Sequence, residues 1–228
     1  MLYIILVLPA IIFSLWASHK VKSTYQKYQA SYNSRNITDE QAARYILNQN
    51  GLNNIRIEQI SGTLTDHYDP TSMVIRLSSN VYGSTSVAAV GVACHEVGHV
   101  IQHATNYAPI KIRNSIVPIT NLGSKLSMPL IFAGLIISSF IPFFIYFAYA
   151  GIVCFSLCAV FQLVTLPTEY NASRRAIECI ERNQLLSPEE IEGTKKVLSA
   201  AALTYVAALA VSLTQLIYYI SILGRRRH

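Results

Sequence analysis

The chain has 228 residues, of which 52% are hydrophobic and only 13% are Asp, Glu, Lys or Arg. An ordinary soluble domain has about 25% charged residues. Three stretches, residues 1–18, 126–168 and 197–224, carry no charged side chain at all. The composition excludes a wholly soluble globule, a disordered chain and a small disulfide-stabilised protein. It predicts a mainly α integral-membrane protein with about four membrane segments and a small water-soluble part.

Residues 1–18 predict an N-terminal membrane anchor, because about 20 helical residues cross the hydrocarbon core. Met1, Leu2 and Tyr3 lack the Lys or Arg that begins a signal peptide. Basic residues follow the apolar stretch instead, at positions 20, 22 and 27. This charge distribution predicts an uncleaved anchor with its N-terminus outside.

Residues 19–125 are predicted to form the main soluble part. The sequence Thr38-Asp39-Glu40-Gln41 is a capping box and Gly51 fits a helix C-cap, so a helix is expected over 39–49. Alternating apolar residues then predict strands over 55–60, 62–69 and 73–77, with a turn at 69–72. Ser84-Thr85-Ser86 can cap a further helix from Val87 to about residue 102 or 104.

Residues 126–168 are about twice the length of one span, so we expect a transmembrane hairpin. The turn is predicted at Ala148–Gly151, with Pro142 bending the incoming helix. The polar segments 19–125 and 169–196 flank this hairpin and must therefore lie on one side of the membrane. They hold most of the Lys and Arg residues, so that side is expected to be cytoplasmic.

Residues 197–228 predict a C-terminal membrane segment with a basic tail. Residues 197–223 are long enough for one tilted span. A full crossing would place Arg225, Arg226 and Arg227 outside, against the charge rule. The segment therefore either crosses against its charge or lies along or re-enters the membrane, and both alternatives stay open.

The motif His95-Glu96-Val97-Gly98-His99 lies in the helix predicted to begin at Val87. Histidines four positions apart share one face of a helix, so both imidazoles can bind one metal ion, and zinc suits such ligands. A Glu directly after the first His can deprotonate a metal-activated water. The alternative is a pair of hydrogen-bonded core histidines with an incidental Glu96.

A catalytic zinc site usually has three protein ligands, so a third is expected. Glu169 is favoured, because it follows Pro167 directly after the hairpin, at the start of a predicted helix. A Glu in a first helical turn can instead interact with the helix dipole. Ser173, four residues on, shares its face and could hydrogen-bond a ligand. The full set of candidates on this side of the membrane is Asp66, His67, Asp69, His103 and Glu169.

Four segments, residues 64–70, 93–99, 107–109 and 166–176, together resemble the membrane-embedded neutral zinc metallopeptidases of the zinc peptidase 2 (YugP-type) family. The chain is more remotely similar to the Ste24-type and HtpX membrane peptidases. The resemblance implies a zincin-like domain with His95, His99 and Glu169 on zinc and Glu96 as general base. Those remoter relatives carry Asp where this chain has Ser173, which places the corresponding hydrogen bond in question.

Several polar residues are candidates for supporting roles. A donor for the tetrahedral oxyanion could be His67, Tyr170, Arg174 or Arg175. The polar run from Asp66 to Asp69 fits either a turn with Asx-type hydrogen bonds or an edge strand that pairs with an extended substrate. Both interpretations stay open.

The expected function is that of an integral-membrane zinc-dependent endopeptidase with one Zn²⁺ per chain. We expect peptide or membrane-protein substrates and an active site on the cytoplasmic side near the bilayer. A non-enzymatic membrane scaffold or sensor with a structural zinc site is the alternative. Nucleic-acid binding is not expected, because the net charge of +6 comes with no recognisable binding motif.

Overall fold

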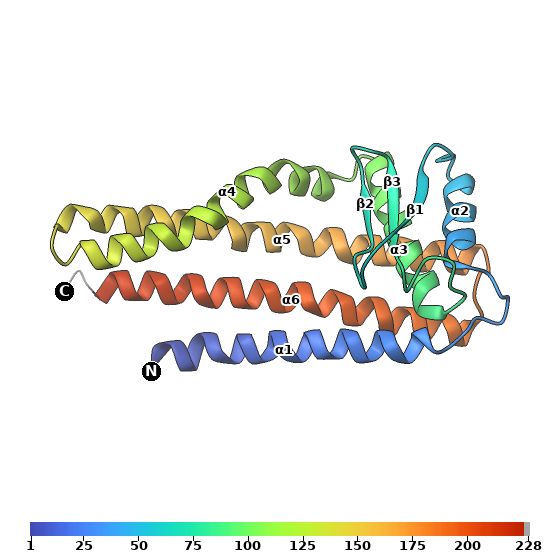
Figure 1. Ribbon diagram of the computed structural model, residues 1–228, viewed down its shortest axis with the longest axis horizontal. Coiled ribbons are helices and arrows are strands. Elements are labelled where there is room, and N and C mark those ends of the chain that lie inside the picture. Colours follow the sequence, from blue (N-terminus) through green and yellow to red (C-terminus); the bar gives the residue numbers. More distant parts are fainter. Residues whose placement is uncertain (226–228) are drawn as a thin grey trace. The chain divides into compact units, whose positions relative to one another are not determined.

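The computed structural model describes residues 1–225, and the last arginines of the predicted basic tail, Arg226 and Arg227, lie outside the described residues. The fold class is confirmed as mainly α with a small sheet (Figure 1). The elements in chain order are α1 (Leu2–Gln29), α2 (Asp39–Gln49), β1 (Arg56–Ile60), β2 (His67–Asp69), β3 (Val74–Ser78), α3 (Val87–Ala104), α4 (Ala108–Ile137), the 3₁₀ helix η1 (Pro142–Phe144), α5 (Ile145–Arg182) and α6 (Pro188–Arg225).

The chain divides into two compact units. The apolar unit consists of residues 1–17, 111–167 and the described residues from 204 onward. The second unit, which we call the sheet unit, consists of residues 18–110 and 168–203. Within residues 1–225, four helical segments are long and apolar enough to cross a membrane: Leu2–Gln29, Ala108–Ile137, Pro142–Arg182 and Pro188–Arg225. This agrees with the predicted number of membrane segments.

The turn of the hairpin lies at residues 138–144, so the prediction of a turn at Ala148–Gly151 is wrong. Pro142 begins η1, where its missing N–H costs no helical hydrogen bond. The small residues Ala148 and Gly151 lie instead where α5 contacts α4. A Cβ atom on Gly134 would overlap the backbone of Ala148, and one on Gly151 would lie 2.7 Å from the backbone nitrogen of Ile131. They allow α4 and α5 to pack closely.

Helix α5 runs through Pro167 without a break, so the prediction that Glu169 begins a helix is also wrong. A proline inside a helix removes one backbone hydrogen bond, which a long helix can absorb as a local bend. Glu169 therefore lies deep within α5, and a first-turn interaction with the helix dipole does not apply to it.

The sheet unit contains a three-stranded sheet in the order β1-β3-β2. β1 pairs with β3 in parallel and β2 pairs with β3 in antiparallel orientation, with His67 opposite Arg76. β2 is shorter than the predicted strand over 62–69, because Gly62 and Leu64 have positive φ angles that interrupt an extended backbone. β2 is therefore a short edge strand.

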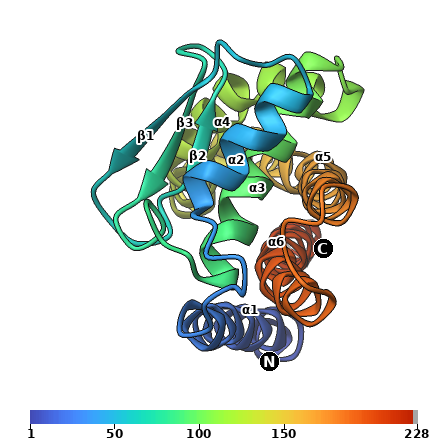
Figure 2. The same ribbon diagram turned by 90° about the vertical axis from the view of Figure 1, so that its right-hand side faces the viewer.

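The capping signals predicted from the sequence are present. The Thr38 hydroxyl accepts a hydrogen bond from the Gln41 backbone N–H, and the Gln41 side chain accepts one from the Thr38 N–H. The Ser86 hydroxyl caps α3 by accepting from the Ala89 N–H at 3.2 Å. α2 packs against α3, and α3 packs against β2 and β3 (Figure 2). Their apolar faces form the core, in which Ile46, Leu47, Ile75 and Leu77 are fully buried.

This core contains an ionisable side chain, Asp39, and burial of its charged form lowers the free energy of unfolding. Asp39 opens α2 and is fully buried, and neither carboxylate oxygen receives a hydrogen bond of ordinary geometry within the described residues. Burial raises the pKa of the Asp39 carboxyl to about 7, although the nearby backbone amides of Glu40 and Ser84 partly oppose that rise. The unfolded chain ionises this group near the ordinary value of 3.8.

Replacing Asp39 with Asn should therefore stabilise the protein more at pH 8 than at pH 5. The folded state holds a proton that the unfolded state releases above pH 4, so stability falls as the pH rises towards 7. The advantage of Asp39→Asn over wild type should grow by about 2 kcal/mol between pH 5 and pH 8. Thermal unfolding in detergent measures it, with Glu189→Gln in the exposed first turn of α6 as the control. If the stability difference between Asp39→Asn and wild type does not change with pH, the raised pKa of Asp39 is wrong.

Candidate metal centre

The two histidines of the motif lie on one face of α3. Their ring centroids are 4.8 Å apart and the rings are nearly perpendicular, as expected for positions i and i+4 of a helix. His99 is buried, and the side chain of His95 is 16% exposed. One edge of the pair therefore remains accessible.

Helix α5 brings the acidic partner to this face because Gly98 allows close approach. A Cβ atom at Gly98 would overlap the carbonyl oxygen of Ala172 and lie about 3.0 Å from its carbonyl carbon. Only glycine permits the backbones of α3 and α5 to come this near. Since Ala172 lies three residues after Glu169, the contact places Glu169 beside both histidines.

His95, His99 and Glu169 form what we call the His–His–Glu cluster. The Glu169 Oε2 atom lies 3.3 Å from His95 Nε2 and 3.6 Å from His99 Nε2, and the donor atoms all lie within 4.8 Å of one another. Ligand atoms about 2.0–2.1 Å from a tetrahedral zinc are separated by about 3.3–3.4 Å. The two separations from the carboxylate oxygen therefore match those around a zinc ion. It is the one group of three potential ligands of this kind found in residues 1–225.

Hydrogen bonds to the outer ring nitrogens orient both histidines. His99 Nδ1 lies 3.0 Å from the Gln102 Oε1 atom, and the Gln102 amide N–H donates to the Thr168 carbonyl oxygen at 2.7 Å. Because that carbonyl can only accept, the Gln102 oxygen must face His99. An amide oxygen can only accept as well, so the proton of a neutral His99 is on Nδ1 and Nε2 is left to bind a metal.

Ser173 takes the corresponding place beside His95. Its hydroxyl oxygen lies 3.1 Å from His95 Nδ1, and Ser173 stands one helical turn after Glu169. A hydroxyl can donate or accept, so it fixes the proton position of His95 less strictly than the carboxylate of the remoter relatives would.

Gln102 was not among the residues predicted for the site. It is fully buried, and its amide also donates to the Asn171 Oδ1 atom at 3.0 Å. Gln102 thus joins α3 to α5 on both sides of Glu169. Its signal in the sequence is a polar amide three positions after His99 in a mostly apolar helix, and such an amide is costly to bury without partners.

Glu96 is buried beside the cluster, with 7% of its surface exposed. Burial raises the pKa of its carboxyl, the neighbouring His99 and His95 oppose that rise, and Glu169 and Asp66 add to it. A buried carboxyl whose pKa lies above its ordinary value takes up a proton more readily than an exposed one, as a general base must.

The other candidate ligands lie elsewhere. Asp66 accepts hydrogen bonds from the Ser78 backbone N–H and hydroxyl, at 2.7 and 3.0 Å. Asp69 accepts from the Thr71 N–H and the Ser72 hydroxyl, which are the Asx-type contacts expected of a turn. His67 is exposed on the edge strand, with its Nδ1 2.8 Å from the Thr65 carbonyl oxygen. His103 is in the last turn of α3, where its ring meets Tyr68.

The suggested oxyanion donors on α5 differ in exposure and in the groups that they contact. Tyr170 is half exposed, and Arg174 forms an exposed ion pair with Glu178 at 3.7 Å. Arg175 donates to the Asn171 Oδ1 atom at 2.8 Å and lies over the ring of Tyr107. Arg175 and Gln102 therefore donate to the same oxygen atom of Asn171.

A helical membrane-protein fold with a His–His–Glu cluster of zinc-ligand type is the arrangement expected of a membrane zinc metallopeptidase. Comparison with known proteins agrees. The chain belongs to the family described as "Putative neutral zinc metallopeptidase", whose model matches residues 3–224. It is 44% identical over 222 residues to the "Putative membrane protease YugP" of Bacillus subtilis (strain 168), and the alignment covers 97% of this chain and 96% of that protein. No solved structure matches the chain.

The Gly98 contact predicts that Gly98→Ala will disrupt the cluster. An added methyl group must push α5 away, at a cost of about 1–3 kcal/mol, and Glu169 moves with it. We expect both a lower melting temperature and loss of bound zinc, measured by unfolding in detergent and by metal analysis.

Gly224→Ala is the matched control, because a Cβ atom there meets nothing within 4 Å. Alanine favours a helix over glycine by about 1 kcal/mol, so this variant should be neutral or slightly more stable. Full zinc content in Gly98→Ala would show that the close approach of α3 and α5 is not required.

Proposed function

We propose that the protein is an integral-membrane zinc endopeptidase, with one zinc per chain held by His95, His99 and Glu169. The observation that supports this proposal most strongly is the separation of 3.3 and 3.6 Å between the Glu169 carboxylate oxygen and the two imidazole nitrogens. Three such donors leave a fourth tetrahedral position open, which is the arrangement of catalytic rather than structural zinc sites. The family description also names zinc and peptidase activity.

Glu96 is the proposed general base. A bound zinc ion would polarise a water molecule and the carbonyl group of the bond to be cut. The Glu96 carboxylate would take the proton from this water and later pass it to the leaving amine. Its burial supports the first of these steps, because a raised pKa makes the protonated acid easier to form.

An extended peptide is the proposed substrate, and β2 is the proposed place for its backbone to pair. β2 has β3 on one side only among the described strands, and it packs against α3 through the contact of Tyr68 with His103. An exposed edge strand offers a row of free backbone hydrogen-bonding groups. His67 lies on this strand, where it would be near a bound peptide.

We further propose that the site faces the cytoplasm and acts on membrane proteins or on unfolded segments near the bilayer. The polar segments that supply the cluster, 19–125 and 169–196, hold most of the Lys and Arg residues. A purely structural zinc site would have no need of a buried Glu96 beside it. Removal of zinc by a chelator distinguishes the two: an enzyme loses cleavage while the fold largely persists, whereas a scaffold loses its fold.

The proposal predicts that two carboxyl substitutions both lower cleavage but differ in their effect on bound zinc. Glu96→Gln should keep about one zinc per chain and lower cleavage of an unfolded reporter peptide by about 100-fold or more. Glu169→Ala should lose most of its zinc and its cleavage together. Metal analysis and a peptidase assay on the purified protein measure both.

Glu178 provides the matched control, because it lies on the same helix as Glu169 and its side chain is exposed. Neither Glu178→Gln nor Glu178→Ala should change zinc content or cleavage. If Glu96→Gln cleaves as fast as wild type, the assigned base is wrong. If Glu169→Ala retains its zinc, the third ligand lies elsewhere.

A further inference from the structure

The sheet unit contains a cavity with several lysine side chains in its lining. It has a volume of about 710 Å³, and none of the three cluster residues lines it. Its walls come mainly from α1 and α6, and we call it the lysine groove. The residues that define it are Lys20, Thr24 and Lys27 on α1 and Lys196, Ser199 and Leu203 on α6.

Helical periodicity builds this groove. Lys20, Thr24 and Lys27 stand at positions i, i+4 and i+7, so they share one face of α1. The three α6 residues stand at i, i+3 and i+7 and likewise share a face. Gly193 lets the helices approach, since a Cβ atom there would lie 2.7 Å from the Tyr28 ring.

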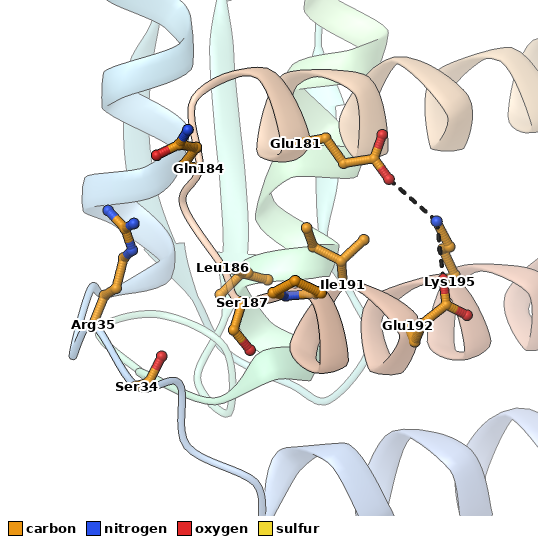
Figure 3. A pocket seen from close by; sticks show the side chains of 10 residues that line it. Ser34, Arg35, Glu181, Gln184, Leu186, Ser187, Ile191, Glu192 and Lys195 are labelled. Atoms are coloured by element: carbon orange, nitrogen blue, oxygen red, sulfur yellow. Dashed lines mark hydrogen bonds and ion pairs between the residues drawn. The ribbon is translucent and has the colours of Figure 1, made fainter.

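The groove carries an excess of positive charge. Within residues 1–225, Lys20, Lys27 and Lys196 form no ion pair with a carboxylate. Lys195 also lines the groove, but Glu192 and Glu181 neutralise it at 3.0 and 3.2 Å. Glu192 and Lys195 also line a second cavity, and Figure 3 shows Lys195 there between its two partners. The acid that lines the groove, Glu192, is thus paired with Lys195, and the other three lysines share the lining with the hydroxyl groups of Thr24 and Ser199.

The positions of these cations in the chain indicate the source of the anion. Lys20 is the first charged residue after the charge-free residues 1–18, and Lys196 is the last before the charge-free residues 197–224. Both helices continue without interruption into these apolar stretches. Lipid phosphates lie at the boundary of the hydrocarbon core, at the level where such helices first carry charge.

We propose that the lysine groove binds the phosphate of an anionic phospholipid. Lys20, Lys27 and Lys196 contact the phosphate, the hydroxyl groups of Thr24 and Ser199 donate to its oxygens, and Leu203 contacts the start of an acyl chain. A free phosphate would use the same cations but would gain nothing from Leu203. The inference does not depend on peptidase activity.

Native mass spectrometry of the full chain in detergent tests the proposal by titration with phosphatidylglycerol or phosphatidylcholine. Wild type should retain one phosphatidylglycerol in preference to phosphatidylcholine. The double variant Lys20→Gln/Lys196→Gln should bind it at least tenfold more weakly, because each lysine near an anionic lipid surface contributes about fivefold to affinity. Lys20→Arg/Lys196→Arg should bind like wild type, because arginine keeps both charges. An unchanged melting temperature of Lys20→Gln/Lys196→Gln excludes misfolding as the cause of its weaker binding.

Lys22→Gln/Arg182→Gln is the matched control, since it removes the same charge from exposed positions that do not line the groove. It should change affinity less than threefold. Tyr170, which also lines the groove, is left unchanged because it adjoins Glu169. Equal losses in the groove and control variants would overturn the proposal, as would equal binding of the two lipids. Displacement of the lipid by an equal concentration of inorganic phosphate would overturn the lipid assignment.

Discussion

The contact between Gly98 of α3 and Ala172 of α5 is the constraint on which the candidate metal centre depends. The two histidines are fixed relative to each other by a single helix, but Glu169 lies some 70 positions further along the chain. Glycine removes the side chain that would hold the helices apart, so the carboxylate comes within 3.6 Å of both imidazoles. Gln102 then joins the same two helices through His99 and the Thr168 carbonyl group. Backbone packing and side-chain orientation thus support one geometry.

Local signals in the sequence were sufficient to place α2, α3 and the two motif histidines. The capping box at Thr38 and the serine cap at Ser86 each satisfy backbone N–H groups within one turn, so they specify where α2 and α3 begin. The spacing of His95 and His99 is equally local, because a helix of known period carries both. Charge-free stretches predict membrane segments for a similar reason, since burial in lipid excludes charge along a continuous run of residues.

Interactions between distant segments could not be predicted in this way. The small residues Ala148 and Gly151 resemble a turn, yet they are small because α4 packs closely against them. Gly134 of α4 meets Ala148, and Gly151 meets the backbone of α4 at Ile131. Pro167 resembles a helix boundary, but the length of α5 on both sides carries the helix across it. The partners of Gln102 come from a helix more than 60 residues away. Each case depends on which backbones meet, which residue type alone does not encode.

We propose that α3 and α5 together hold zinc through two imidazoles and a carboxylate. Cys94, next to His95, is the nearest alternative donor in the sequence, but it is completely buried in the core, and burial raises the pKa of its thiol so that the metal-binding thiolate is disfavoured. X-ray absorption at the zinc edge of the purified protein tests the claim most directly. Zinc bound by His95, His99 and Glu169 should show nitrogen and oxygen neighbours at about 2.0–2.1 Å, with an imidazole signature. A sulfur neighbour at about 2.3 Å would contradict it.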